Sequence, residues 1–194
     1  MKFGEGTEIC GEGEPVEFVY EIVSGAVRTV KVLSDGRREI GGFYFAGDIF
    51  GFEDDNEHSL SAEAVVASTV RVIRRRRLVH LAADDRKLAE ELLTMAMHEA
   101  ARAHRHALML AMTAQERVND FVLEMAERIS VGDLLRLPMS RQDIADYLGL
   151  TMETVSRTIT GLTVASTISL PYSRTIMLRN RSALEQAMAA TPAL

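Results

Sequence analysis

The sequence contains one cysteine and no tryptophan among its 194 residues. A single cysteine excludes a disulfide framework, a four-cysteine zinc site and an iron–sulfur cluster held by this chain alone. No apolar run approaches the roughly 18 residues that a membrane-spanning helix requires, so we expect no membrane partner. The amino-terminal residues also lack the apolar centre of a signal peptide. These absences favour a cytoplasmic protein.

Acidic side chains outnumber basic ones, 28 to 22, and the formal charge of −6 ordinarily disfavours a nucleic-acid partner. The imbalance is uneven along the chain. Residues 1–80 hold 14 acidic and 10 basic side chains, and residues 81–134 hold 10 and 6. Residues 135–194 hold 4 acidic side chains against 6 arginines. The carboxyl-terminal part is therefore the one whose charge suits an anionic partner.

Residues 1–83 show the pattern of short strands joined by tight turns. Strand-forming or alternating residues occupy 18–23, 26–33, 38–45 and 61–73. Asp35 and Gly36 lie between the second and third of these segments, and they predict a hairpin because glycine adopts a positive φ without steric cost. Several short strands with glycine turns predict a jelly roll, a form of β-roll.

Residues 84–112 contain neither glycine nor proline and are rich in residues that favour a helix. Asp84 or Asp85 can cap the start of this helix, which would span roughly 40 Å. Small and apolar residues recur along it in steps of four and three: Leu93, Met97, Ala100, His104, Ala107 and Ala111. This stripe predicts close pairing of two such helices, and the alternative is a helix packed on its own domain. A second amphipathic helix is predicted over 114–130.

Residues 140–162 carry the pattern of a helix-turn-helix. Ser140 and Asp143 resemble a capping box at the start of a first helix, Gly149 suits a tight turn, and Thr151 can cap a second helix. Apolar residues at helical spacing give each helix one buried face. A short helix, a turn containing glycine and a second helix together predict DNA binding.

The second helix leaves polar side chains on its outer face: Glu153, Thr154, Ser156, Arg157 and Thr160. Arginine can donate two hydrogen bonds to a guanine edge, glutamate can accept one from a cytosine amine, and serine can contact a base or a phosphate. A glutamate in the first turn also stabilises the helix dipole. The alternative is an ordinary solvated helix face.

Two strand patterns, 167–170 and 175–178, follow the second helix and predict a β-hairpin, which makes the motif a winged helix. Arg174 lies at the tip of this hairpin, and Arg141 lies at the start of the first helix. Both are candidates for contacts with DNA phosphates, which set the register without reading sequence.

The stretch LPMSRQDIADYLGLTMETVSRTI resembles the helix-turn-helix of the CRP/FNR transcription regulators, most of all the FixK branch. VYEIVSGAVRTVKVLSDGRREIGGFYFAGDIFGFE is similar to the family's sensor domain, and TIMLRNRSAL is similar to the end of its wing. The resemblance implies an α+β fold with a cyclic-nucleotide-binding-type β-roll over 1–83, a dimerisation helix over 84–112 and a winged helix-turn-helix over 113–194. It also implies a homodimer that binds a palindromic double-stranded DNA site with TTGAT-like half-sites, contacts RNA polymerase and activates genes of low-oxygen metabolism.

The resemblance further implies roles for single residues. The base-reading positions of the family match Glu153, Ser156 and Arg157, and its backbone-contacting positions match Arg141, Thr151, Thr154 and Arg174. Met152 stands where the cAMP-responsive branch has a base-reading arginine, which favours the FNR/FixK specificity class. The approach to the wing, 163–166, lacks the glycine that is usual there.

The resemblance is incomplete at the ligand pocket. The cAMP receptors hold the cyclic phosphate with an acid after a glycine, here Gly47 and Asp48, and with an Arg-Ser pair, which here reads His58-Ser59. Because the phosphate-binding cation is missing, these four residues are expected to form a vestigial ligand pocket. Oxygen sensing of the FNR type requires four cysteines, and only Cys10 is present. We therefore expect no cofactor, whether cyclic nucleotide, haem or iron–sulfur cluster, and a regulator governed by its own abundance. The alternative is gating by a small molecule, a cyclic nucleotide or haem.

The remaining clusters of polar residues do not predict a metal site. His98, His104 and His106 lie on the predicted long helix at offsets that do not converge on one metal or haem iron. The acidic segment 53–57 lacks the glycine and terminal glutamate of an EF-hand, so we expect a solvated loop.

Two further features point away from a redox or catalytic role. Cys10 lies among glutamates, which raise the pKa of a thiol, so we expect no redox switch. The run Arg74–Arg77 is interpreted as a solvated or salt-bridged hinge rather than a nucleic-acid patch. No motif places a nucleophile beside a base, a phosphate-binding loop or a pair of catalytic carboxylates, so we expect no enzyme. A jelly-roll binding or enzyme domain with a helical tail is the alternative of a different class.

Overall fold

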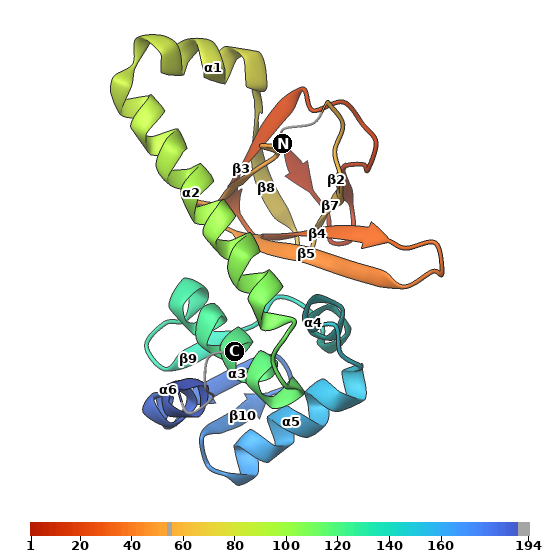
Figure 1. Cartoon of the computed structure of the whole chain (residues 1–194), viewed down its shortest axis with the longest axis vertical. Coiled ribbons are helices and arrows are strands. Elements are labelled where there is room, and N and C mark those ends of the chain that lie inside the picture. Colours follow the sequence, from red (N-terminus) through yellow and green to blue (C-terminus); the bar gives the residue numbers. More distant parts are fainter. Residues whose placement is uncertain (54–55, 190–194) are drawn as a thin grey trace. The chain divides into compact units, whose positions relative to one another are not determined.

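The computed structural model describes residues 1–53 and 56–189. These residues form two compact units, which meet in the chain between Arg105 and His106 (Figure 1). The first unit contains β1 to β8, the helix α1 and most of α2, and the second contains β9 to β11 and the remaining helices. Within the described ranges, every helix is too short or too polar for a membrane crossing.

The first unit is built from two antiparallel sheets of four strands each. One sheet has the order β1 (Lys2–Phe3), β8 (Ser68–Arg74), β3 (Phe18–Ser24) and β6 (Ile49–Phe50). The other has the order β2 (Glu8–Cys10), β7 (Ser61–Ala64), β4 (Ala26–Val32) and β5 (Arg38–Phe45). Neighbours in each sheet are often distant in sequence, as in a jelly roll.

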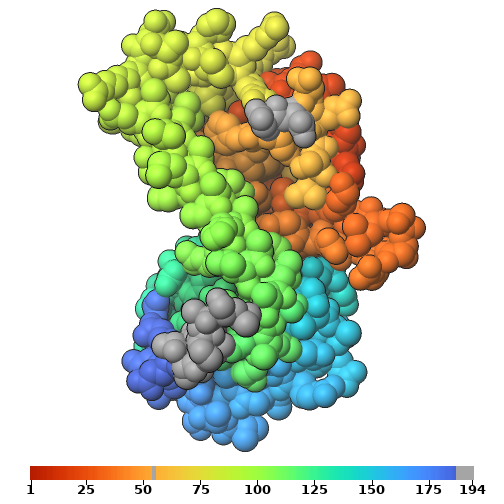
Figure 2. Space-filling model, viewed as in Figure 1, coloured from red at the N-terminus to blue at the C-terminus, as the bar shows by residue number. Residues whose placement is uncertain are grey.

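The β-roll predicted from the strand pattern is confirmed, with one change. The hairpin at Asp35 and Gly36 joins β4 to β5, with Gly36 at φ +83°, and it projects from the body of the first unit (Figure 2). The single strand predicted over 61–73 is wrong, because β7 ends at Ala64 and β8 begins at Ser68 in the other sheet. Apolar alternation continues across the turn, so the period alone does not reveal the change of sheet.

The two sheets enclose an apolar core. Its buried members are Cys10, Tyr20, Ile22, Val27, Tyr44, Phe50, Ala62 and Val70. Strand alternation supplies them, because every second side chain of a strand faces the same side. The rings of Tyr20 and Phe50 stack with centroids 4.9 Å apart. Tyr44 and Phe50 also line a hollow of the β-roll, so the core fixes one wall of the predicted ligand pocket.

The helix predicted over 84–112 is α2 (Arg86–Met109), and a helix that the sequence did not predict, α1 (Arg75–Asp84), precedes it. Asp85 separates them with extended backbone, at φ −122° and ψ 99°. Its carboxylate accepts hydrogen bonds from the backbone N–H groups of Lys87 and Leu88, at 3.0 and 3.1 Å. Because Asp85 caps the start of α2 with extended backbone, it cannot continue α1. The cap predicted at Asp84 or Asp85 is therefore the residue that separates the two helices.

The run Arg74–Arg77, interpreted as a solvated or salt-bridged hinge, lies where β8 joins α1, and three of its four residues are exposed. Arg74 ends β8, and the three arginines after it form the first turn of α1. Arginine is a good helix former, and the run contains no glycine or proline to interrupt the backbone. Strand β8 therefore leads directly into a helix that the sequence did not predict.

The second unit combines four helices with a three-stranded sheet. Its helices are α3 (Ala114–Ile129), α4 (Arg141–Leu148), α5 (Met152–Val164) and α6 (Arg181–Ala189). Its sheet has the order β10 (Ile168–Tyr172), β11 (Thr175–Leu178) and β9 (Leu134–Arg136). Helix α3 starts with a capping box between Thr113 and Glu116. The predicted helices over 114–130 and 140–162 and the hairpin after them are all present.

Ser166 replaces the missing glycine between α5 and the wing. It has φ +58°, the only positive φ of a non-glycine residue in the described chain. Ser166→Gly is expected to raise the free energy of unfolding by about 0.5–1 kcal/mol, because glycine has no Cβ to clash in the left-handed region. Urea unfolding tests this against Ser130→Gly, where φ is −75° and no gain is expected. Equal destabilisation by both changes would contradict the account of strain.

Candidate nucleic-acid interface

Helix α4 starts and ends at the residues that the sequence predicts. The Ser140 hydroxyl accepts a hydrogen bond from the N–H of Asp143 at 3.1 Å, and the Asp143 carboxylate accepts one from the N–H of Ser140 at 2.9 Å. Gly149 ends the helix at φ +60°, where its N–H donates to the carbonyl of Ala145. Because this φ strains residues that have a Cβ, glycine is what the turn requires.

Helix α5 is capped by the threonine that the sequence indicates. The Oγ1 atom of Thr151 accepts a hydrogen bond from the N–H of Thr154 at 3.2 Å, and the two hydroxyl oxygens lie 2.9 Å apart. The inner face of the helix is buried through Val155, Ile159 and Leu162. Caps and buried face together fix the rotation of α5 and place its opposite face at the surface of the second unit, drawn light blue in Figure 2.

The exposed face of α5 brings together the three predicted base-reading residues, Glu153, Ser156 and Arg157. The Arg157 guanidinium donates to the Glu153 carboxylate at 2.7 Å, and their side chains are 74% and 81% exposed. An ion pair this exposed contributes little to stability. Either partner can therefore exchange the pair for a hydrogen bond to a base edge.

Arg141 and Arg174 meet at one hollow of about 150 Å³, although 33 positions separate them. Arg174 donates from Nη1 to the carbonyl of Pro138 at 3.2 Å. The Nη1 atom of Arg141 is buried, and no described residue accepts a hydrogen bond from it. Burial lowers the pKa of the Arg141 guanidinium. A buried N–H group without an acceptor is unfavourable, and a phosphate oxygen in this hollow would supply the acceptor.

Two residues that support α4 carry roles that sequence reasoning missed. Arg117 of α3 donates to the carbonyls of Leu110, Met112 and Leu148, at 2.6, 2.9 and 2.9 Å. One guanidinium thereby holds the end of α4 and the segment before α3. His106 stacks on the ring of Tyr147, with centroids 4.2 Å apart, and lies 2.8 Å from its carbonyl oxygen. No pattern in the sequence pairs these residues, because the contacts depend on tertiary packing.

The predicted vestigial ligand pocket is a hollow of about 200 Å³ in the β-roll. Its lining includes His58 and Ser59, together with Tyr44, Phe50, Glu53 and Glu99. His58 is 3% exposed, and its Nδ1 lies 2.8 Å from the Glu53 carboxylate. Gly47 and Asp48 lie on the preceding turn, with Gly47 at φ +94°. The structure thus places two of the four predicted residues in the lining and two beside it.

The residues of this hollow do not fit a cyclic phosphate. The one described lining side chain that can become a cation is His58, and Glu53 already binds it. Glu53 and Glu99 would repel a phosphate. The Asp48 carboxylate accepts from the N–H of Phe45 at 2.8 Å and from Arg102 at 3.2 Å. A site for an anion would instead aim an arginine into the hollow.

Cys10 is buried, with 4% of its surface exposed. Burial, and after it the charges of Glu53 and Glu14, raise the pKa of the thiol to about 11. At pH 8, iodoacetamide is expected to alkylate native Cys10 about 100-fold more slowly than in the urea-unfolded chain, because the thiolate is that much scarcer. Mass spectrometry measures both rates on the single cysteine. Equal rates would contradict an inert thiol.

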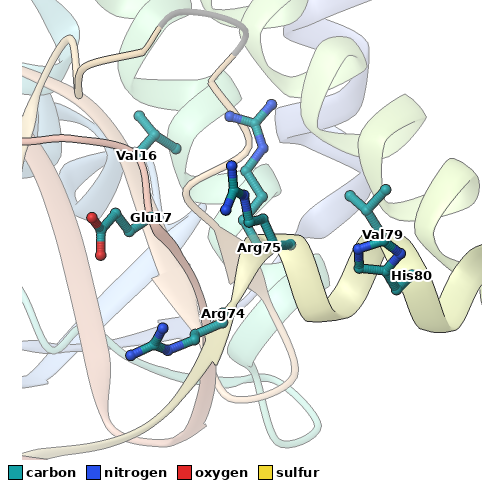
Figure 3. A pocket seen from close by; sticks show the side chains of 7 residues that line it. Val16, Glu17, Arg74, Arg75, Val79 and His80 are labelled. Carbon is teal, nitrogen blue, oxygen red and sulfur yellow. The ribbon is translucent and has the colours of Figure 1, made fainter.

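The other candidate groups take ordinary positions in the structure. Arg74, Arg75 and Arg76 share a cleft of about 560 Å³ with Glu17 and His80, and this cleft belongs to the first unit (Figure 3). His98 and His104 are exposed on α2. Within the described ranges, no three His, Cys, Asp or Glu side chains are placed to hold a metal ion. The predicted loop over 53–57 includes residues 54 and 55, which lie outside the described residues.

Two family descriptions match the chain. Residues 1–85 match a cyclic nucleotide-binding domain, and residues 116–187 match a Crp-like helix-turn-helix domain. The two matches coincide with the β-roll and with the unit that contains α4 and α5. They support the fold predicted from the sequence.

Relatives match nearly the whole chain. A nitrogen fixation regulation protein FixK from Azorhizobium caulinodans is 45% identical over 190 residues, which cover 95% of this chain and 77% of the relative. FixK from Rhizobium meliloti is 43% identical over 92% of this chain and 82% of the relative. The structure of FixK2 from Bradyrhizobium japonicum superposes with a TM-score of 0.93 at 45% identity, covering 99% of this chain and 98% of that one. These relatives are regulators and not enzymes.

Proposed function

Because this chain belongs to the CRP/FNR family of transcription regulators and carries a DNA-binding helix-turn-helix of the kind found in FixK proteins, we propose that it binds a palindromic promoter site as a homodimer and activates transcription. The half-sites would be TTGAT-like, and RNA polymerase would be the protein partner. The observation that carries this proposal is the exposed face of α5, where Glu153, Ser156 and Arg157 stand together on a helix fixed by its caps and its buried face.

The proposal divides the interface into two groups of residues. Glu153, Ser156 and Arg157 would read base edges in the major groove. Arg141 and Arg174 would bind phosphates at their common hollow, while Thr151 and Thr154 would contact the backbone beside the first turn of α5. The unsatisfied Nη1 atom of Arg141 supports the second group, since it lacks an acceptor among the described residues.

The exposed stripe on α2 supports the homodimer. Five of the six residues of the predicted stripe lie on α2, and the sixth, Ala111, follows its end. All six are exposed in the single chain, and Leu93 and Met97 are 62% and 63% exposed. Two exposed large apolar side chains, followed along the helix by small alanines, favour burial against a second copy. In the dimer, the two α5 helices would enter successive major grooves about 34 Å apart.

The chemistry of the β-roll hollow supports regulation without a cyclic nucleotide. Its described acids and the pairing of His58 disfavour an anionic ligand. We infer that the regulator binds no cofactor and that the amount of the protein in the cell sets its activity. We also infer, from its likeness to nitrogen fixation regulators, that its target genes serve low-oxygen metabolism. The hollow of about 200 Å³ favours a second candidate, gating by a small molecule.

A mobility-shift assay tests DNA binding directly. The full chain should retard a duplex with a TTGAT…ATCAA palindrome and should leave a scrambled duplex of the same composition free at moderate salt. A folded dimer that binds both duplexes equally would contradict the proposal.

Calorimetric titration with cyclic nucleotides and an absorbance scan for haem separate the two modes of control, because saturable binding of either would contradict regulation by abundance.

A further inference from the structure

Helix α2 reaches the edge of the β-roll hollow through two side chains, Glu99 and Arg102. The hydroxyl of Tyr44 donates to Oε1 of Glu99 at 2.7 Å. Arg102 donates to Oδ1 of Asp48 at 3.2 Å and pairs with Glu99 on its own helix. The guanidinium also lies over the Tyr44 ring, 5.2 Å from the centroid. Four residues from β5, the following turn and α2 thus form one connected network.

This network is more buried than the other ion pairs of α2. The side chains of Arg102 and Asp48 are each 26% exposed, whereas those of Arg86 and Glu90 are 92% and 63% exposed. Solvent therefore screens the network less. Burial and the charge of Glu99 raise the pKa of Tyr44, so its hydroxyl remains a hydrogen-bond donor. The hydrogen bond and charge of Glu99 raise the pKa of Arg102 despite its burial.

The spacing of the two α2 residues explains how one helix supplies both contacts. Positions 99 and 102 are three residues apart, so their side chains lie on the same face of the helix. Glu99 lines the hollow, and Arg102 reaches the turn that carries Gly47 and Asp48. Tyr44, which lines the hollow, and Asp48, on the turn beside it, are therefore already engaged by the chain itself.

We propose that Glu99 and Arg102 are positioning residues that replace an effector. They engage Tyr44 of the hollow and Asp48 of the turn beside it and fix α2 against the β-roll, which keeps the dimer competent for DNA without a small molecule. This inference rests on the proposed function, because its readout is DNA binding. It assigns Asp48 a partner inside the chain in place of a ligand.

Arg102→Ala in the full chain tests the proposal. It is expected to weaken binding to the palindrome by about 5–150-fold, the range of ordinary coupling between sites. Amide hydrogen exchange at residues 44–50 should become faster at the same time, because α2 no longer holds the turn. Arg102→Lys should restore part of both properties, since it keeps the charge but not the planar fork. Arg86→Ala, which breaks an exposed pair on the same helix, should change affinity less than about twofold.

The outcomes separate this inference from the proposed function. If the wild-type chain binds the palindrome and Arg102→Ala binds it equally well while exchange at 44–50 is faster, the network does not control DNA binding and the inference is wrong. Unchanged exchange would show that α2 does not hold the turn, which also contradicts it. A wild-type chain that binds no palindrome contradicts the proposed function instead. Glu99→Gln, which keeps an acceptor for Tyr44, gives a second variant if Arg102→Ala unfolds.

Discussion

Arg157→Ala is expected to weaken binding to a TTGAT-type palindrome by on the order of 1–3 kcal/mol per half-site and to relax the preference at one base position. The Arg157 side chain is 74% exposed on α5, and its ion pair with Glu153 is itself exposed. The substitution removes a fork that can bind a guanine edge, together with an exposed ion pair that contributes little to stability. Fluorescence anisotropy on duplexes changed one base at a time measures both effects.

Arg174→Ala is the matched control for this prediction. Arg174 lies in the wing at the hollow that it shares with Arg141, where we expect a phosphate. Its loss should weaken binding to all sequences alike and reduce the dependence of affinity on salt, because one phosphate contact disappears. Identical behaviour of the two variants would contradict the division into base-reading and phosphate-binding residues.

Phe121→Ala is expected to lower the free energy of unfolding of the second unit by about 3–5 kcal/mol. Phe121 is 1% exposed in α3, and its ring centroid lies 5.9 Å from that of Tyr147 in α4. The substitution leaves a cavity beneath the helix that supports α5, so specific DNA binding should also fall. Urea unfolding followed by circular dichroism measures the loss.

Tyr172→Ala is the matched control for the core substitution. Tyr172 lies in the wing and is 76% exposed, so its truncation should change stability by no more than about 0.5 kcal/mol. A loss from Phe121→Ala as small as that from Tyr172→Ala would contradict the account of the core.

Much of the fold follows from local sequence patterns. The hairpin at Gly36, the cap at Ser140 and the turn at Gly149 depend on residues a few positions apart, and the structure contains all three. The errors arise where a pattern has two structural solutions. Apolar alternation from 61 to 73 fits one strand or two. The sequence predicts the start of α2 after Asp85, but it does not predict the helix α1 that ends before Asp85.

The candidate interface is partly local and partly tertiary. Glu153 and Arg157 share a face because they are four positions apart on a helix, so the sequence predicts that they lie close together. Arg141 and Arg174 meet only because β10 and β11 return to the start of α4, and Arg102 meets Asp48 across 54 positions. No periodicity encodes such contacts. The net charge of −6 is also misleading about the partner, because it averages over the whole chain. The arginines that suit DNA lie in residues 135–194.

Selection of bound sites from random duplex DNA tests the central claim most directly, because it reports the partner, the symmetry and the specificity together. The account predicts enrichment of a twofold-symmetric sequence with TTGAT-like half-sites whose centres lie about one helical turn apart. Recovery of no common sequence, or of a single half-site without symmetry, would contradict a homodimer that reads DNA through α5.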